Sequence, residues 1–349
     1  MSRTIAVGTL ILIVVAGSQA LGFGSYAAPN AMTRPDDFAA FWGNVSYQAS
    51  LAAVPADPDR SGAIAFPVDG RQTCEQELAR WVGSPMKMPV LHLTDWWADD
   101  VAIDDLEGTA TLHLRLLPGA SREYGWDPSG LPDPYACCLR DAVLAARRGL
   151  RYLLSQPDVH APKVGLVGEG FGGAVALALA ALEPTHIAFV AIHQPMPAYH
   201  FRADGTPAVS DYVLRPLERV DPELLRDGQQ LQRSITYFDF FNFAPDVKAP
   251  AMVSYSVSDP VAGADQAMAI YSHLGGYKRL CAAQHDTHLA EADRVDFYAA
   301  TYTWLQSVGL VRSRVTPSLG DPVVRPLTGS QPTVGIRGTQ RSKIIALQR

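Results

Sequence analysis

The run Val164-Gly-Leu-Val-Gly-Glu-Gly-Phe-Gly-Gly173 decides the fold of this chain. Its apolar first half predicts a strand over 163–167, and the small residues after it predict a helix over 172–182. A strand, a glycine-rich turn and a helix form the setting of the G-x-S-x-G motif, whose strained turn holds a nucleophilic serine above a sheet. Here the third position of that motif is Gly170. The sequence therefore predicts a nucleophile's scaffold without the attacking atom.

The segments on either side alternate between strand and helix patterns. Further strands are expected at 89–93, 110–117, 187–192, 251–256 and 278–282, and further helices from Thr33 and at 135–156, 262–274 and 294–310. This alternation predicts an α/β fold with a mostly parallel sheet between helices. The stretch from about His200 to Pro245 interrupts it and predicts a cap or insertion over the carboxyl edge of the sheet.

Composition narrows the class of protein. The 349 residues are 48% hydrophobic and 18% charged, which is typical of a folded globular chain. The formal net charge of −6 argues against a nucleic-acid partner, because phosphate binding requires a basic surface.

Both ends of the chain differ from its middle. Arg3, the apolar run Ile5–Ala16 and the small residues of Ser18-Gln-Ala20 predict a signal peptide over 1–20, and hence a secreted or periplasmic protein. An uncleaved membrane anchor is the alternative. Beyond Val311 arginines accumulate among Pro, Gly, Ser and Thr, which predicts a basic, disordered tail over 312–349 and a domain over 29–311.

The four cysteines fit no zinc-binding spacing. In an oxidising compartment one disulfide is an option, and burial as small apolar residues is the other. The sequence leaves both open for Cys74, Cys137, Cys138 and Cys281.

Three segments resemble one known family. They are Pro35-Asp-Asp-Phe-Ala-Ala-Phe-Trp42, the stretch Leu139–Pro157, and Tyr237-Phe-Asp-Phe-Phe-Asn-Phe-Ala244 with the following Val247-Lys-Ala-Pro250. Together they resemble the acetyl xylan esterase and cephalosporin-C deacetylase family, carbohydrate esterase family seven. The resemblance runs over residues 33–310 and implies the α/β-hydrolase fold.

The resemblance also implies positions for a catalytic triad. The family's nucleophile falls on Gly170 and its acid on Asp259. Its histidine falls on His285 or His288, with His285 preferred. The order nucleophile, acid, histidine is that of α/β-hydrolases.

The oxyanion region implied by the resemblance is Asp95, Trp96 and the backbone of Phe171. The family has a His-Gly-Tyr turn where this chain has Leu93-Thr-Asp-Trp-Trp97. A carboxylate there opposes a developing negative charge, whereas an oxyanion hole needs hydrogen-bond donors.

Each of these residues has a second interpretation. Glu169 could serve as nucleophile or base, although the residue before an elbow nucleophile points away from the substrate. The glycine-rich turn could hold phosphate, but it has no Gly-Lys-Ser/Thr ending and Glu169 would repel an anion. Asp259 could simply cap the next helix.

Two further alternatives concern other ligands. His285, Asp286 and His288 could bind a metal, but their spacing in a loop defines no strong geometry. Trp96 and Trp97 could stack on a sugar ring, although such aromatics more often fill a core or an interface.

The resulting expectation is a secreted acetyl xylan esterase-like protein that does not hydrolyse esters through a serine. It needs no cofactor and no metal, and its expected role is to bind an acetylated carbohydrate or small ester or to act as an assembly partner, with a homo-oligomer as one option. The alternative is an active carbohydrate deacetylase that uses an unrecognised nucleophile or an activated water. That alternative needs another polar side chain within reach of His285 or His288.

Overall fold

The computed structural model describes residues 32–51, 74–75, 88–95, 109–116, 130, 133–157, 159–196, 228–283, 285 and 288–311. All of them belong to one compact unit that ends at Arg312. The predicted signal peptide, the predicted tail, and the residues Trp96, Trp97 and Asp286 lie outside the described residues.

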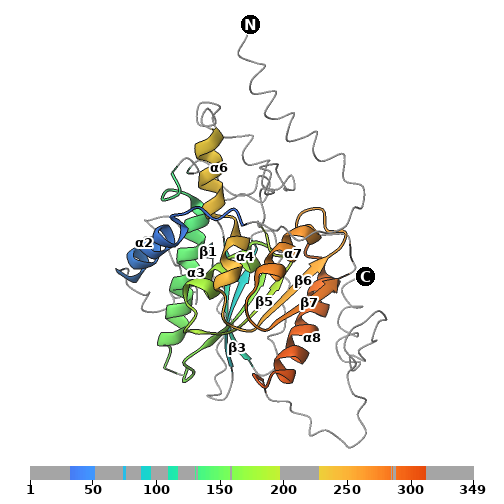
Figure 1. Cartoon of the computed structure of the whole chain (residues 1–349). Helices are drawn as coiled ribbons and strands as arrows, with labels where there is room; N and C mark the ends of the chain where they lie inside the picture. The colour runs from blue at the N-terminus through green and yellow to red at the C-terminus, as the bar shows by residue number, and fades with distance from the viewer. Residues whose placement is uncertain are drawn as a thin grey trace, which may run out of the picture. The chain divides into compact units, whose positions relative to one another are not determined.

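A seven-stranded sheet with strand order β1-β3-β2-β4-β5-β6-β7 forms the centre of the unit (Figure 1). Strands β2 to β7 run parallel, and only the two-residue strand β1 pairs antiparallel, with β3. The strands are β1 (Cys74–Glu75), β2 (Met88–Thr94), β3 (Thr109–Leu116), β4 (Val164–Glu169), β5 (Ile187–His193), β6 (Ala251–Ser256) and β7 (Lys278–Ala283). The predicted mostly parallel α/β fold is confirmed.

Helices cover both faces of this sheet (Figure 1). They are α2 (Phe38–Leu51), α3 (Cys138–Ser155), α4 (Phe171–Leu182), α6 (Gly228–Tyr237), the 3-10 helix η2 (Phe240–Asp246), α7 (Ala264–His273) and α8 (Glu291–Ser307). None of the helices in the described residues is long and apolar enough to cross a membrane.

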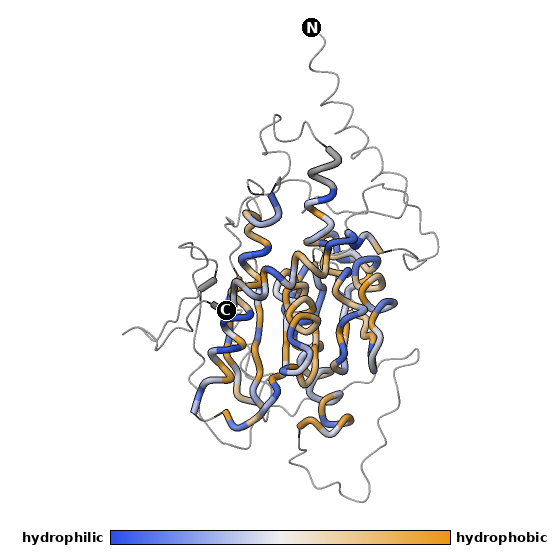
Figure 2. Tube along the Cα trace, turned by 60° about the vertical axis from the view of Figure 1, so that its left-hand side comes forward, coloured by the Kyte–Doolittle hydropathy of each residue, from blue (hydrophilic) through white to orange (hydrophobic). Residues whose placement is uncertain are grey.

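Alternate residues of each strand enter two different cores, as the two-residue period of a strand requires. On β4, Leu166 packs with α3, α4 and η2, whereas Val167 faces α8. On β5, Ile192 lies in the same core as Leu166, and Ala191 lies in the same core as Val167. Figure 2 shows the extended segments in the middle of the unit as mainly orange, between helices with blue stretches. The site described below therefore has one apolar layer above the sheet and another beneath it.

The segment expected to be an insertion contributes to the core. Phe240, Phe241 and Phe243 of η2 are buried in the larger hydrophobic cluster together with α4. Trp42 of α2 donates a hydrogen bond from its ring nitrogen to the Tyr237 carbonyl oxygen at 3.2 Å. The expected cap therefore cannot extend to Pro245, because the aromatic run before it fills the interior. Residues 201–227 lie outside the described residues.

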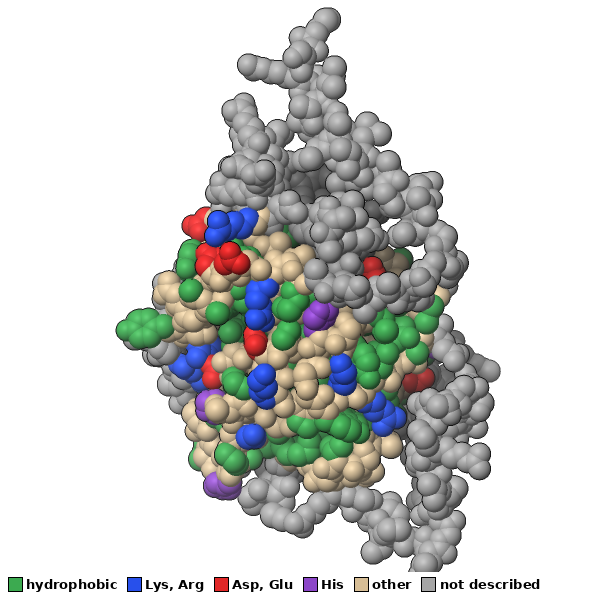
Figure 3. Space-filling model, viewed as in Figure 1, with side chains coloured by type: hydrophobic (Ala, Val, Ile, Leu, Met, Phe, Trp, Pro, Cys, Tyr) green, Lys and Arg blue, Asp and Glu red, His purple; other side chains and the backbone are tan. Residues whose placement is uncertain are grey.

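Cys137 and Cys138 are buried at the start of α3, in line with the interpretation as small apolar residues. On the surface, Lys and Arg side chains are scattered among hydrophobic and acidic ones on the face drawn in Figure 3, with no continuous basic patch there.

Candidate active site

The turn between β4 and α4 has the backbone of a nucleophile elbow. Gly170 has φ +53° and ψ −123°, a conformation that side-chain-bearing residues rarely adopt. Gly172 is needed for a different reason, because a Cβ there would lie 2.1 Å from the Leu93 carbonyl oxygen. The turn thus lets the start of α4 approach the end of β2 closely.

Asp95, which directly follows β2, fills the space that a side chain at Gly170 would use. A Cβ built on Gly170 would lie 2.3 Å from Oδ2 of Asp95. The same Oδ2 accepts a hydrogen bond of 2.9 Å from the backbone N–H of Phe171, the first residue of α4. That N–H is the donor that an elbow aims at an oxyanion. In this protein it is already bound to a carboxylate, and Asp95 is fully buried.

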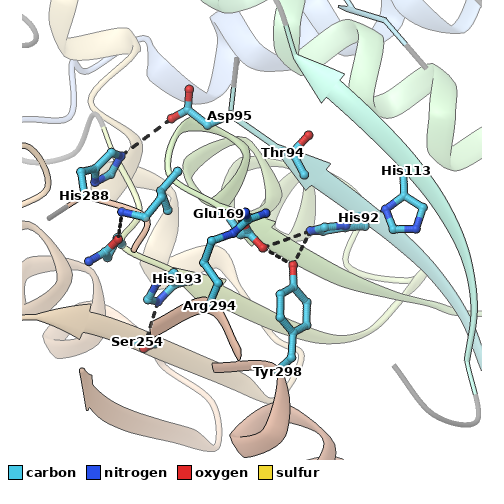
Figure 4. Close-up of polar contacts among 12 residues, drawn as sticks. His92, Thr94, Asp95, His113, Glu169, His193, Ser254, His288, Arg294 and Tyr298 are labelled. Atoms are coloured by element: carbon cyan, nitrogen blue, oxygen red, sulfur yellow. Dashed lines mark hydrogen bonds and ion pairs between the residues drawn. The ribbon is translucent and has the colours of Figure 1, made fainter. Parts of the chain in front are cut away.

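His288 faces Asp95 from the loop after β7 (Figure 4). Its Nδ1 lies 2.8 Å from Oδ2 of Asp259, and its Nε2 lies 4.0 Å from Oδ2 of Asp95. The second distance is too long for a hydrogen bond, so Asp95 acts on His288 through its charge. Nε2 has no hydrogen-bond partner among the described residues.

Asp259 also organises the turn after β6. Its Oδ1 accepts backbone hydrogen bonds from Val261 at 2.8 Å and Ala262 at 3.1 Å. The cap residue of α7 is Gly263, so Asp259 braces the preceding turn and does not cap that helix. These donors and His288 outweigh the effect of burial and lower the pKa of Asp259.

The charge of His288 follows from this arrangement. Burial alone would lower the pKa of His288, but Asp259 and Asp95 outweigh it and raise the pKa to about 9. Near neutral pH the site therefore holds an imidazolium between two carboxylates.

The geometry selects His288, and not the preferred His285, as the partner of Asp259. His285 is half-exposed, and its Nδ1 lies 2.5 Å from Oδ1 of Asp293 on α8. The sequence alone placed both histidines in the same short loop, and only the path of that loop separates them. Within the described residues no group of His, Cys, Asp or Glu is arranged to hold a metal ion.

Backbone strain gathers around the same site. Among the described residues other than glycine, only Gln194 (φ 44°) and Leu289 (φ 53°) have positive φ. Gln194 follows β5, and its Oε1 accepts a 2.6 Å hydrogen bond from the N–H of Leu289, next to His288. Such conformations are unfavourable and persist only where surrounding contacts impose them. These two residues fix the loop that positions His288.

A second polar group lies beneath the elbow, on the α8 face of the sheet (Figure 4). Glu169 turns away from Asp95 and accepts a hydrogen bond of 2.6 Å from Arg294 Nε and another from the Tyr298 hydroxyl. His92 Nε2 lies 2.7 Å from that hydroxyl, and its Nδ1 lies 2.8 Å from Nδ1 of His113. Glu169 therefore serves a buried ion pair and does not face the elbow.

Burial and charge set the protonation of this group. Burial would raise the pKa of Glu169, but His92 and Arg294 outweigh it and lower the pKa to about 2. Burial lowers the pKa of His92, and it lowers that of His193 to about 4. His193 bonds Ser254 Oγ through Nδ1 at 3.1 Å and stacks on Phe297 of α8. Both histidines are neutral near pH 7.

No motif in the sequence identified this lower group, although a signal was present. His92 and His113 each interrupt an apolar strand in the same Leu-His-Leu context, and they are register partners on β2 and β3. A polar residue at the same depth of two adjacent buried strands needs a polar partner. Arg294 and Tyr298 gave no comparable signal, because one turn of a surface helix commonly carries such residues.

Comparisons with known proteins agree with this architecture. The profile of the family described as acetyl xylan esterase (AXE1) matches residues 118–307, more than half of the chain. The acetyl esterase Axe7A of Xylanibacter ruminicola is 27% identical over 139 residues, which cover 40% of this chain and 30% of that protein. The match thus spans less than a third of that relative's length.

Two solved structures share the fold. The acetyl xylan esterase from Paenibacillus sp. R4 has a TM-score of 0.62 at 22% identity, over 79% of this chain and 98% of that one. Acetyl xylan esterase 1 from Thermoanaerobacterium sp. JW/SL YS485 has a TM-score of 0.59 at 18% identity, over 80% of this chain and 96% of that one. At these identities the likeness shows the α/β-hydrolase fold alone. With the family profile over 118–307, the chain belongs to the acetyl xylan esterase family.

Proposed function

We propose that this protein is a member of the acetyl xylan esterase family that does not hydrolyse esters through an acyl-serine. The observation that carries the proposal is the Asp95 carboxylate, which lies where a side chain at Gly170 would be and accepts the Phe171 N–H. An ester carbonyl would have neither an alcohol to attack it nor that donor for its oxyanion.

The charge of His288 supports the same conclusion. A serine hydrolase needs a neutral imidazole as general base. With a pKa of about 9, His288 is neutral in only about one molecule in a hundred at pH 7. Asp259 and Asp95 together thus keep His288 from acting as a base near neutral pH, and Asp95 also binds the oxyanion donor.

The expected ligand remains an acetylated carbohydrate or small ester, bound without serine chemistry, and a homo-oligomer is one option for the assembly. The family membership supports the ligand class. The residues of 1–20 support export through a cleaved signal peptide. N-terminal sequencing of the exported chain tests this, with a new terminus expected at Leu21, after Ser18-Gln-Ala20, or at Ala28, after the second small-residue site Ser25-Tyr-Ala27. An intact Met1 or Ser2 on a cytoplasmic chain is the contrary result.

The test of the main proposal is hydrolysis of 4-nitrophenyl acetate, together with labelling by a fluorophosphonate. The wild-type chain is expected to hydrolyse the ester at the rate of buffer and to stay unlabelled. Removing a triad nucleophile costs on the order of a millionfold in turnover. Hydrolysis well above background that is lost in His288→Gln but retained in His285→Gln would overturn the proposal and favour an active deacetylase.

A further inference from the structure

A carboxylate oxygen lies at the amino end of α4 between groups from two different elements. The Phe171 N–H donates a hydrogen bond of 2.9 Å to Oδ2 of Asp95, and Nε2 of His288 lies 4.0 Å from the same oxygen. The first N–H groups of a helix have no partner within the helix, and its positive end attracts anions. An oxygen at this position therefore meets a hydrogen-bond donor and a buried cation together.

The His288 ring is the second, independent sign of an anion site. Its side chain is only 9% exposed, and Nε2 has no hydrogen-bond partner among the described residues. Asp259 holds the other ring nitrogen at 2.8 Å, which directs Nε2 toward Asp95 (Figure 4). A buried N–H without an acceptor is unfavourable. An acceptor about 1 Å closer than Oδ2 of Asp95 would complete the hydrogen bond.

We propose that the elbow is a binding site for a small carboxylate, which Asp95 occupies from within the same chain. The inference deepens the proposed function and rests on the same Asp95 carboxylate. It adds that the groups around Asp95 bind any small carboxylate that takes its place. Because Asp95 is tethered to the site, it competes at a high effective concentration and keeps a free carboxylate out.

The chemistry of the site favours a carboxylate over a neutral ligand of the same shape. Both the helix terminus and the His288 imidazolium stabilise negative charge, and hydrogen bonds to a charged acceptor are stronger than those to a neutral one. The space is also narrow. Asp95 is fully buried, and a Cβ at Gly170 would lie 2.3 Å from its Oδ2.

This confinement predicts which carboxylate fits each variant of Asp95. Asp95→Ala removes a group the size of formate, and Asp95→Gly removes a group the size of acetate. Formate is therefore expected to bind both variants. Acetate is expected to bind Asp95→Gly more tightly than Asp95→Ala, because its methyl group takes the space of the alanine Cβ.

The test is calorimetric titration of the full-length wild-type chain and both variants with sodium formate and sodium acetate at pH 6, well below the pKa of His288. The wild-type chain is expected to bind either anion about a hundredfold or more weakly than the better-matched variant. The amide signal of Phe171, followed by nuclear magnetic resonance, locates the bound anion. If neither variant binds formate or acetate more tightly than the wild-type chain, the proposal is wrong.

Matched controls separate this site from general anion binding. Asp95→Asn keeps a neutral acceptor in place and is expected to bind no better than the wild-type chain, and acetamide is expected to bind none of the variants. Adding His288→Gln to Asp95→Gly is expected to weaken acetate binding at least tenfold. His285→Gln, in the same loop but paired with Asp293, is expected to leave it unchanged. Equal effects of the two histidine substitutions would contradict the proposal.

Folding supplies a second measurement. A ligand that binds only the folded state stabilises it, so acetate is expected to raise the unfolding midpoint of Asp95→Gly in urea and to leave that of the wild-type chain unchanged. If Asp95→Gly is unfolded in plain buffer, acetate is expected to restore the fold, and failure to do so would overturn the proposal. Ester hydrolysis by the wild-type chain, assayed separately, bears only on the proposed function.

Discussion

At the residue scale, Gly170 and Asp95 compete for one position. Gly170 takes the elbow conformation at φ +53° and has no side chain. The Asp95 carboxylate occupies the space that a side chain at this position would fill. Since the same oxygen also accepts a hydrogen bond from the Phe171 N–H and faces His288, a side chain at 170 must displace Asp95 from both of these neighbours.

Gly170→Ser therefore tests the position directly. We expect a loss of stability beyond the cost of a side chain at positive φ, which is on the order of 1 kcal/mol. Gly309→Ser is the matched control, because Gly309 has φ +74° and a Cβ there meets nothing within 4 Å. The free energy of unfolding, measured with urea, is expected to fall more for Gly170→Ser.

Adding Asp95→Gly to Gly170→Ser is expected to recover most of that extra loss and to permit slow fluorophosphonate labelling. The Asp95→Gly single variant completes the double-mutant cycle. If Gly170→Ser and Gly309→Ser lose equal stability, Asp95 does not occupy the side-chain position of residue 170.

Much of this site could be predicted from the sequence, and its central feature could not. The glycine-rich turn pointed to Gly170, the family resemblance pointed to Asp259 and the 285–288 loop, and Asp95 was noted as a carboxylate opposing an oxyanion. That Asp95 itself accepts the Phe171 N–H depends on the close approach of β2 and α4, which no spacing in the sequence reports. Likewise, the choice between His285 and His288 depends on the path of the loop after β7, which no spacing in the sequence reports.

At the element scale, α8 is joined to β4 by a buried ion pair. Arg294 and Glu169 are 4% and 0% exposed. Glu169 also accepts a hydrogen bond from the Tyr298 hydroxyl, which in turn contacts His92. A charge left in such an environment without its partner is costly. This pair therefore attaches the last helix to the strand that carries the elbow.

Arg294→Met is expected to destabilise the fold by about 3 kcal/mol or more, because it leaves the Glu169 carboxylate without its cation. Arg233→Met is the control, since Arg233 and Asp37 form an ion pair with both side chains at least half-exposed. Chemical denaturation is expected to show a much smaller change for that variant. Equal losses in the two variants would contradict the role assigned to Arg294.

The strands and the helices that flank them were predictable, because the two-residue and 3.6-residue periods of apolar residues can be read from a single sequence. The strand at 251–256 was predicted at its observed bounds, and most others differ by one or two residues at an end. The aromatic run in η2 was assigned to an insertion, because a 3-10 helix has neither a two-residue nor a 3.6-residue period.

At the scale of the whole molecule, its histidines set the pH at which the fold is most stable. The pKa of His288 is raised from 6.5, so its stabilising contribution is complete below pH 6.5 and is lost as pH rises through about 9. The pKa values of His92 and His193 are lowered, so their contributions are present above pH 6.5 and are lost on acidification. The alkaline loss from His288 and the acidic loss from His92 and His193 together predict that the free energy of unfolding is highest near pH 6.5.

We expect the free energy of unfolding, measured from pH 4 to 9.5, to peak near pH 6.5. The alkaline limb is expected to fall by on the order of 3 kcal/mol and to be largely absent in His288→Gln. His285→Gln serves as the control and is expected to retain the limb. A profile that rises from pH 6.5 to 9 in the wild-type chain would contradict the charged state of His288.

The account depends above all on Asp95 lying in front of His288 as a carboxylate, and the pKa of His288 reports this most directly. Titration of the His288 ring by nuclear magnetic resonance is expected to give a pKa of about 9 in the wild-type chain. In Asp95→Asn that pKa is expected to fall by about one unit or more, while Asp293→Asn, which removes the carboxylate beside His285, is expected to leave the pKa of His288 unchanged. A wild-type pKa near 6.5 that Asp95→Asn leaves unchanged would contradict the account.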